Sequence, residues 1–381
     1  MTIKTSSDII ENKHSSDESA DNDREENIMS LQTYFKEFDK AIKMDYDVKN
    51  ELKEKRDVLL KILRESEDIP AFDKYDQGSY SMHLGVEPLD KEYDIDVGLR
   101  FHVNCSEYEP MDLKNKIYNL LENHTDYGAK IKKPCVTVTY KKDGEAAYHV
   151  DLVVYTYEDK EDTDSQLYLA RGKNSESDET CWEKSDPVGL VDYVKDKYKG
   201  EDYKEEREQF RRVVRYMKRW KNKKFSSSGN AEPPSIGITL IAVDKFEASK
   251  TYDYLEEKYL YDDLEALLEF AKSIKSLFRY KGISENGRIM YSIEYNLPST
   301  LNFEPNTNVF KKMSDNYMTD FKEKIDALVN ELESVKNETD EVEQCKKLNK
   351  IFGDDFPVPE KKNAAKQQMN YIPTTSSSGV I

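Results

Sequence analysis

The sequence predicts an α/β fold of two lobes, one built around a mixed β-sheet and the other built from helices. Between residues 93 and 157, short runs alternate apolar and polar side chains with period two, as strands do. An Asp-Gly pair at 143–144 separates two of these runs, and such a pair favours a tight hairpin turn. From about residue 186 onward, apolar residues recur at the spacing of amphipathic helices.

The elements of the first lobe follow in order along the chain. Residues 1–28 are acidic and nearly free of apolar side chains, which predicts disorder. Residues 29–66 have helical periodicity, in one long helix or two, and we expect this segment to brace both lobes. The strands and the helix expected after it are "YDIDVGLRFHV" (93–103), the helix "MDLKNKIYNLLENH" (111–124), "PCVTVTY" (134–140) and "AYHVDLVVYTY" (147–157). We assign residues 29–185 to this lobe.

The second lobe, residues 186–356, is expected to be helical. Its predicted helices are 202–224, a segment opened by Pro and Ser at 234–246, 252–278, 321–337 and 340–353. Residues 357–381 are polar and rich in Ser and Thr, which is typical of a flexible tail. The chain has 381 residues, enough for such a two-lobed unit.

Composition excludes several classes of protein. The net charge is −18, whereas a protein that binds duplex DNA neutralises phosphates with clustered Lys and Arg, so we expect no DNA activator. The four cysteines show neither CxxC pairs nor zinc-ligand spacing. No apolar run reaches the roughly 20 residues that span a bilayer, and no signal-peptide pattern opens the chain. We therefore expect a cytoplasmic protein without a membrane partner.

Two acids on one strand are the strongest functional signal. Side chains alternate across a strand, so Asp94 and Asp96 point to the same face, about 7 Å apart along the backbone. Two carboxylates so placed repel each other unless a cation lies between them, and Mg²⁺ prefers a few carboxylates together with substrate phosphates. Asp151 is a third acid, embedded in the apolar run "YHVDLVV". If the two strands are neighbours, Asp94, Asp96 and Asp151 converge as ligands for two metal ions.

A Gly-Ser pair lies about fifteen residues before these acids. Gly78 would let the backbone approach a phosphate, and the Ser79 hydroxyl with adjacent N–H groups would donate to triphosphate oxygens. We group Gln77, which precedes the pair, with this nucleotide-binding set. The loop that follows is long enough for one turn that returns the chain to the acids.

These motifs resemble a known family. "GSY…EYDIDVGLRF…YHVDLVVY" is similar to nucleotidyltransferases of the DNA polymerase β type, and more narrowly to the bacterial CD-NTases of CBASS antiphage systems, relatives of cyclic GMP-AMP synthase and oligoadenylate synthase. The resemblance covers about residues 30–360. Its further blocks are "WEKSDPVGL" (182–190), "RRVVRYMKRW" (211–220), "PSIGITLIA" (234–242), "NLPSTLNFEPNTNVFKKMS" (296–314) and "FGDDFPVP" (352–359).

The resemblance implies a cleft between the lobes that holds nucleotides, with an oligoadenylate synthase-like helical lobe. It also implies that Lys218 and Ser235 contact the triphosphate, that two Mg²⁺ ions bind, with Mn²⁺ as a substitute, and that the substrates are NTPs, ATP first among them. The expected function is template-independent synthesis of a cyclic di- or trinucleotide second messenger. Regulatory proteins acting on the C-terminal tail are expected partners.

Two other functions stay open at this point. One is a linear transferase that adds nucleotides to RNA or protein, which would want a basic channel that the charge of −18 disfavours. The other is a catalytically silent nucleotide-binding scaffold, against which the three intact acids argue. The sequence does not specify the base, ring size or linkage of the product.

Overall fold

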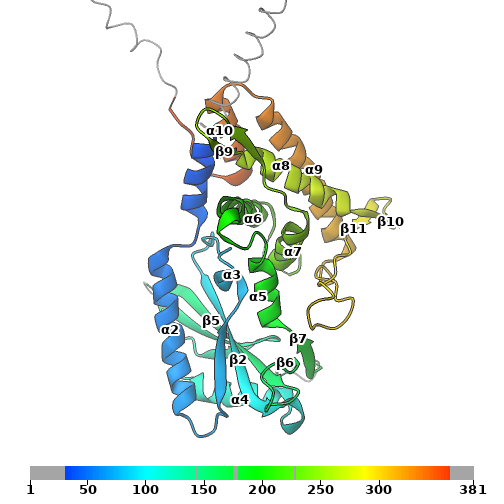
Figure 1. The fold of residues 1–381 in the computed structure, drawn as a ribbon. Coiled ribbons are helices and arrows are strands. Elements are labelled where there is room, and N and C mark those ends of the chain that lie inside the picture. The colour runs from blue at the N-terminus through cyan, green and yellow to red at the C-terminus, as the bar shows by residue number, and fades with distance from the viewer. Residues whose placement is uncertain (1–30, 143–144, 175–178, 227–228, 361–381) are drawn as a thin grey trace, which may run out of the picture.

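The computed structural model describes residues 31–142, 145–174, 179–226 and 229–360. Figure 1 shows the two lobes, with the sheet at one end of the molecule and a group of helices at the other. The predicted disordered segment 1–28 and the part of the predicted tail beyond residue 360 lie outside the described residues. No helix in the described part of the chain is long and apolar enough to cross a bilayer.

The sheet has the order β1-β2-β5-β4-β3, and β6 joins β5 and β7. β2 and β5 are parallel and the other pairs are antiparallel, which confirms the predicted mixed sheet. β4 and β5 form the predicted hairpin pair, although the Asp-Gly pair at 143–144 lies outside the described residues. The strands are β1 (Phe72–Asp76), β2 (Tyr93–Asn104), β3 (Ala129–Ile131), β4 (Val136–Lys142), β5 (Glu145–Tyr157), β6 (Leu167–Arg171) and β7 (Cys181–Ser185).

The segment predicted as one long helix or two is two helices, and each packs in a different core. Residues 31–42 are helical, and their apolar face, which includes Phe35 and Phe38, belongs to the core of the helical lobe. Helix α2 (Tyr46–Glu65) instead packs against the sheet together with α4 (Pro110–Leu121), through residues such as Leu59. The N-terminal segment is thus anchored in both lobes, as bracing requires.

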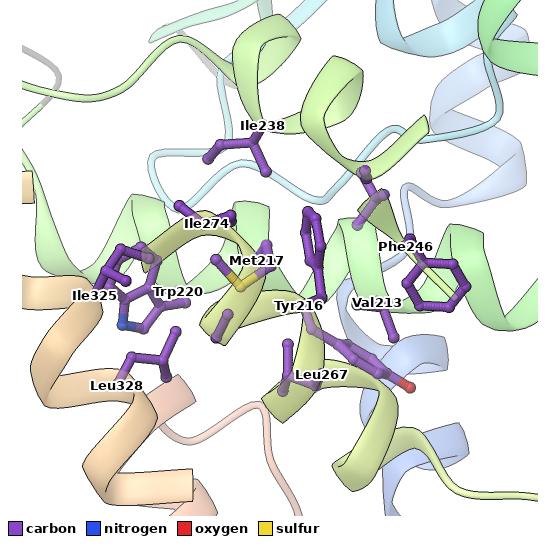
Figure 2. Packing of buried hydrophobic residues seen from close by; sticks show 14 of the residues in the cluster. Val213, Tyr216, Met217, Trp220, Ile238, Phe246, Leu267, Ile274, Ile325 and Leu328 are labelled. Atoms are coloured by element: carbon purple, nitrogen blue, oxygen red, sulfur yellow. The ribbon is translucent and has the colours of Figure 1, made fainter. Parts of the chain in front are cut away.

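Helix α6 (Lys204–Lys224) runs through the centre of the helical lobe (Figure 1). Its apolar stripe, predicted from the sequence, is buried among residues of α7, α8 and α9, and Figure 2 shows Val213, Tyr216, Met217 and Trp220 in this cluster. The other helices of the lobe are α5 (Pro187–Lys195), α7 (Ser235–Lys245), α8 (Asp263–Leu277), α9 (Asp315–Lys336) and α10 (Glu341–Phe352). One-turn 3₁₀ helices span Cys105–Glu107 and Glu201–Tyr203.

The predicted helix over 252–278 is wrong for residues 252–262. β8 (Lys250–Asp253) and β9 (Lys258–Tyr261) form a hairpin, and α8 begins only at Asp263. Asp262 caps that helix by accepting from the Glu265 N–H, while the cross-strand partners Tyr252 and Tyr259 place their rings 5.1 Å apart. Aromatic pairs favour paired strands over a helix. A second hairpin, β10 (Arg279–Ile283) with β11 (Ile289–Ser292), follows α8 and was not predicted.

Candidate active site

The paired acids of β2 lie on the face of the sheet opposite to its core. Ile95 and Val97, the alternate residues, are fully buried, whereas Asp94 is exposed and Asp96 is partly buried. The parallel register places Asp96 beside Asp151 and Asp94 beside His149. The two strands that carry the acids, β2 and β5, are therefore neighbours, as predicted.

These carboxylates are close enough to perturb one another. The pKa of Asp96 is raised to about 7, first by burial and then by the negative charges of Asp151 and Asp94. Although part of Asp94 is exposed, the residues packed around its carboxylate desolvate it and raise its pKa, an effect that His149 opposes and Asp151 reinforces. His149 itself is held between Thr139 and Glu92, at 3.0 Å from each. A concentration of negative charge that nearby cations offset only in part marks a candidate functional site.

Asp151 is turned toward two partners on neighbouring segments. The Thr137 hydroxyl donates to its Oδ1, and the Lys132 ammonium lies 3.6 Å from the same oxygen. Within the described residues, no three His, Cys, Asp or Glu side chains are grouped as metal ligands, so the predicted convergence is present in the register but not in the side chains. The lysine supplies part of the positive charge here.

The donor set nevertheless fits a hard divalent cation. Asp94, Asp96 and Asp151 offer carboxylate oxygens on one face of two adjacent strands, and Mg²⁺ binds through a few carboxylates plus substrate phosphates rather than an all-protein cage. Burial, and after it the negative charges of Asp151 and Asp94, raise the pKa of Asp96, and a bound cation would offset both effects.

The Gly-Ser loop lies directly against the acids. Gly78 opens the one-turn helix α3 (Gly78–Ser81) with φ of +72°, and a Cβ at this position would lie 2.2 Å from Asp96 Oδ2. Only glycine therefore fits, both for backbone conformation and for space. The Gln77 N–H donates to the Asp96 carbonyl at 3.3 Å, and Gln77 Oε1 accepts from the Tyr155 hydroxyl at 3.1 Å.

The helical lobe contributes a buried lysine. Lys218 is 5% exposed, and its ammonium donates to the Leu84 carbonyl at 2.9 Å. Burial, followed by the positive charges of Lys221 and Arg215, lowers its pKa to about 7. Lys221 donates to the Ser235 hydroxyl at 3.0 Å and pairs with Glu232 at 3.2 Å, so Ser235 is already oriented by a cation.

One cavity between the lobes brings most of the predicted residues together. It has a volume of about 420 Å³. Six of the eight predicted site residues line it, namely Gln77, Gly78, Ser79, Asp96, Lys218 and Ser235. Asp94 and Asp151 do not line this cavity and are linked to it through Asp96.

Several lining residues were missed by sequence reasoning. Tyr155 follows Asp151 by four positions on the same strand, so strand alternation could have found it. Phe303 lies within the block 296–314 that supports the family resemblance. Lys221, three residues after Lys218 on α6, does not line the cavity but holds Ser235, and helical spacing could have indicated it.

Comparison with known proteins identifies the sheet lobe. Residues 72–155 match the family model described as "Cyclic GMP-AMP synthase DncV-like, nucleotidyltransferase domain". This segment is a DncV-like nucleotidyltransferase domain. The matched residues run from β1 to Tyr155 and include the Gly-Ser loop and all three acids.

Two curated relatives extend beyond the DncV-like domain. The cyclic GMP-AMP synthase of Escherichia albertii is 30% identical over 174 residues, which are 43% of this chain and 35% of the relative. The c-di-GMP synthase of Roseivirga ehrenbergii is 24% identical over 204 residues, 46% of this chain and 50% of the relative. The chain thus spans half or less of the curated relatives it matches.

The fold is also similar to solved structures. The CD-NTase CdnG of Bradyrhizobium diazoefficiens, solved in complex with GTP, superposes with a TM-score of 0.63 at 13% identity, over 85% of this chain and 96% of that one. The predicted resemblance to bacterial CD-NTases and the predicted two-lobed nucleotidyltransferase fold are therefore confirmed.

Proposed function

We propose that this protein is a template-independent nucleotidyltransferase that makes a cyclic di- or trinucleotide second messenger from NTPs, in antiphage signalling in the cytoplasm. The observation that carries the proposal is the cavity between the lobes, where the Gly-Ser loop and Asp96 face Lys218 and Ser235. The matches to a cyclic GMP-AMP synthase and a c-di-GMP synthase support the same activity.

Asp94, Asp96 and Asp151 are the residues that would hold two Mg²⁺ ions, with Mn²⁺ as a substitute. When bound, such ions neutralise phosphate charge and make the attacking hydroxyl more acidic. Gly78 lets the loop backbone pass directly against Asp96, where a Cβ would lie 2.2 Å from Oδ2, and the Ser79 hydroxyl beside it donates to a phosphate oxygen. Ser235, oriented by Lys221, donates from the opposite lobe.

Lys218 has a charge that depends on its surroundings. Its pKa is about 7 in the protein without ligand, because burial disfavours the ammonium. A triphosphate in the cavity brings negative charge to it, which raises the pKa and fixes the proton on Nζ. Lys218 then stabilises the charge that develops on the departing pyrophosphate.

The bond changes balance without a further reactant. A ribose hydroxyl oxygen of one nucleotide attacks the α-phosphorus of another, the bond from that phosphorus to the β-phosphate oxygen breaks, and pyrophosphate leaves. Asp151 accepts the hydroxyl proton. A repeat of the same step within the linear intermediate closes the ring, and a cavity of about 420 Å³ lies in the range of about 300–1,000 Å³ that is usual for small-molecule sites.

The test is to incubate the protein with all four NTPs and Mg²⁺ or Mn²⁺ and to analyse the products by mass, before and after phosphatase. A short product that resists phosphatase is expected, with at least one adenine. A phosphatase-sensitive ladder of growing oligomers would favour the linear transferase. Nucleotide binding without release of pyrophosphate would favour the silent scaffold.

The proposed partners follow from charge and from the tail. Duplex DNA at low salt should leave the rate unchanged, because the net charge is −18 and binding to DNA requires clustered cations. Regulatory proteins that act on the C-terminal tail stay a prediction. Co-purification with and without residues 361–381 would test for them.

A further inference from the structure

A stripe of cations on α6 serves two different pockets. Arg211, Arg215 and Lys218 are spaced by four and three residues, so they share one face of the helix. Lys218 lines the nucleotide cavity, whereas Arg211 and Arg215 line a separate pocket of about 180 Å³. The nucleotidyl-transfer mechanism does not use this second pocket.

Positive charge exceeds negative charge in the second pocket. Its ionisable lining residues are Lys43, Lys49, His83, Glu208, Arg211 and Arg215. Glu208 pairs with Arg211 at 2.7 Å, and Asp39 holds Arg215 through two hydrogen bonds of 2.6 and 2.9 Å. The carboxylate that acts on Lys49 is that of Asp45, and its effect is smaller than those of burial and of the neighbouring cations Lys43 and Arg215. Lys43, Lys49, Arg211 and Arg215 thus face three carboxylates, those of Asp39, Glu208 and Asp45, so this small pocket in a chain of net charge −18 has an excess of about one positive charge.

The side chains of this pocket respond to its charge. Burial lowers the pKa of Lys49, and the neighbouring Lys43 and Arg215 lower it further, against a smaller opposing effect of Asp45. Burial and the positive charge of Arg211 likewise lower the pKa of His83. A bound anion would offset this mutual repulsion.

The segment His83–Gly85 connects the two pockets through its backbone hydrogen bonds. The carbonyls of His83 and Leu84 both accept from α6, from Arg215 at 3.0 Å and from the Lys218 ammonium at 2.9 Å. The next carbonyl, of Gly85, accepts from the Met44 N–H, just before α2, at 3.4 Å. The Leu84 N–H also donates to the Ser79 carbonyl at 3.0 Å. Leu84 lies between His83 and Gly85, which line the second pocket, and it hydrogen-bonds to Lys218 and Ser79 of the nucleotide cavity.

We propose that the pocket of Lys43, Lys49, His83 and Arg211 binds a compact phosphate-bearing anion of the size of inorganic pyrophosphate, and that its occupancy changes the nucleotide affinity of the cavity. The volume of about 180 Å³ is below the range of about 300–1,000 Å³ usual for drug-sized ligands, which selects a small anion. Guanidinium and ammonium groups together favour phosphate oxygens. The binding site is independent of the proposed enzymatic function, and only the coupling to nucleotide rests on it.

Calorimetry with inorganic pyrophosphate in EDTA tests the binding site. The titration uses the Ser79→Ala variant, in which we expect weaker binding of phosphate in the nucleotide cavity, because Ser79 lines that cavity. Adding Lys49→Ala should weaken pyrophosphate binding at least about tenfold, and adding Lys43→Ala should weaken it at least about threefold. Lys61→Ala is the matched control, because it removes the same charge from an exposed position of the same helix and should change the affinity less than about twofold.

Two results would overturn the site. One is a Ser79→Ala protein that binds no pyrophosphate, and the other is binding that both Lys49→Ala and Lys43→Ala leave unchanged. Thermal unfolding of each variant, followed by circular dichroism, establishes that the protein titrated is folded. Orthophosphate and a phosphorylated sugar serve as further probes, which separate a site for the leaving group from a site for a phosphorylated metabolite.

A second titration tests the coupling. The affinity for a non-hydrolysable ATP analogue is measured with and without pyrophosphate, in the unmodified protein and in Lys49→Ala. Direct competition in the cavity affects both proteins equally, so a difference of at least about threefold between them reports the second pocket. Equal responses would contradict the coupling. Failure of the analogue to bind either protein would instead count against the proposed function and leave the calorimetric result standing.

Discussion

The two lobes bring groups of opposite charge to the nucleotide cavity, Asp96 from the sheet lobe and Lys218 from the helical lobe. In both groups the surroundings disfavour the charged form. The sheet lobe gathers acids, and the pKa of Asp96 rises to about 7. The helical lobe contributes a lysine, and the pKa of Lys218 falls to about 7. In both groups burial is the largest cause, so each lobe has desolvated a charge without supplying its full counter-charge. A ligand that carries both cations and phosphates would complete both.

The lobes reach this state by different structural means. In the sheet, strand alternation and the parallel register of β2 with β5 place like charges side by side, so repulsion adds to desolvation. In the helical lobe, a long side chain carries its ammonium into the interior, where the Leu84 carbonyl accepts from it. The acids are therefore positioned by backbone geometry and the lysine by one flexible side chain. Substitutions on the sheet side should have the larger effects.

Asp96→Asn tests the sheet side most strongly. The change keeps the shape and removes one carboxylate from the cluster, so we expect the rate of nucleotidyl transfer to fall at least about 10³-fold while the protein stays folded. Pyrophosphate release measures the rate. Asp68→Asn, at an exposed position after α2, is the matched control and should be neutral. Substantial activity of Asp96→Asn at saturating Mg²⁺ would remove Asp96 from the site.

Gly78→Ala, compared with a control glycine, separates the effect of a steric clash from that of backbone strain. The new Cβ would lie 2.2 Å from Asp96 Oδ2, so either the loop or the carboxylate must move. We therefore expect nucleotide affinity to fall about 10²-fold. Gly229→Ala is the control: Gly229 has a similar φ of +67°, but its Cβ would meet no atom within 4 Å. Equal losses in stability and affinity for the two variants would show that backbone conformation alone explains Gly78.

Lys218→Met tests the helical side. Methionine keeps the length of the side chain and removes a buried charge, so we expect nucleotide affinity to fall about tenfold and thermal stability without ligand to rise by a few degrees, roughly as for 1 kcal/mol. Equilibrium binding and calorimetric melting measure the two effects. Lys204→Met, at the exposed start of the same helix, should change neither. A stability loss in Lys218→Met would mean that the lysine is structural.

The parts of this site that the sequence predicts are those encoded by short-range pattern. Asp94 and Asp96 share a face because strands alternate, and Gly78 stands out because few residues allow a tight approach. Phe303 reaches the cavity only through the tertiary path of a loop far along the chain, which no local pattern encodes. The β8–β9 hairpin was predicted as a helix because its Glu, Leu and Lys residues are common in helices. The observed hairpin is favoured instead by the cross-strand pairing of Tyr252 with Tyr259.

The orientation of Asp151 shows the same limit in the chemistry. The register that brings it beside Asp96 follows from two predicted strands, but its contacts with Thr137 and Lys132 depend on β4 and on the segment before it. Sequence reasoning therefore located the acids and missed the cation that accompanies them. Lys132 lies three residues before Cys135, in a stretch without any periodic signal.

The smallest expected effect is a pair of opposite pH dependences of stability, measured in EDTA without nucleotide. Asp96 has a folded pKa of about 7 against 3.8 for an aspartate in water, so its favourable contribution is complete below about pH 4 and is lost as the pH rises toward 7. Lys218 has a folded pKa of about 7 against 10.5 for a lysine in water, so its contribution is complete above about pH 10.5 and is lost as the pH falls toward 7. Asp96→Asn should therefore melt higher than the unmodified protein by about 3 °C at pH 8 and by much less at pH 4.5. Lys218→Met should show a gain at pH 6 that shrinks by pH 10. Suppose instead that the changes in melting temperature of both variants were independent of pH. Neither Asp96 nor Lys218 would then carry a charge in unfavourable surroundings, and the variants would differ from the unmodified protein only in packing.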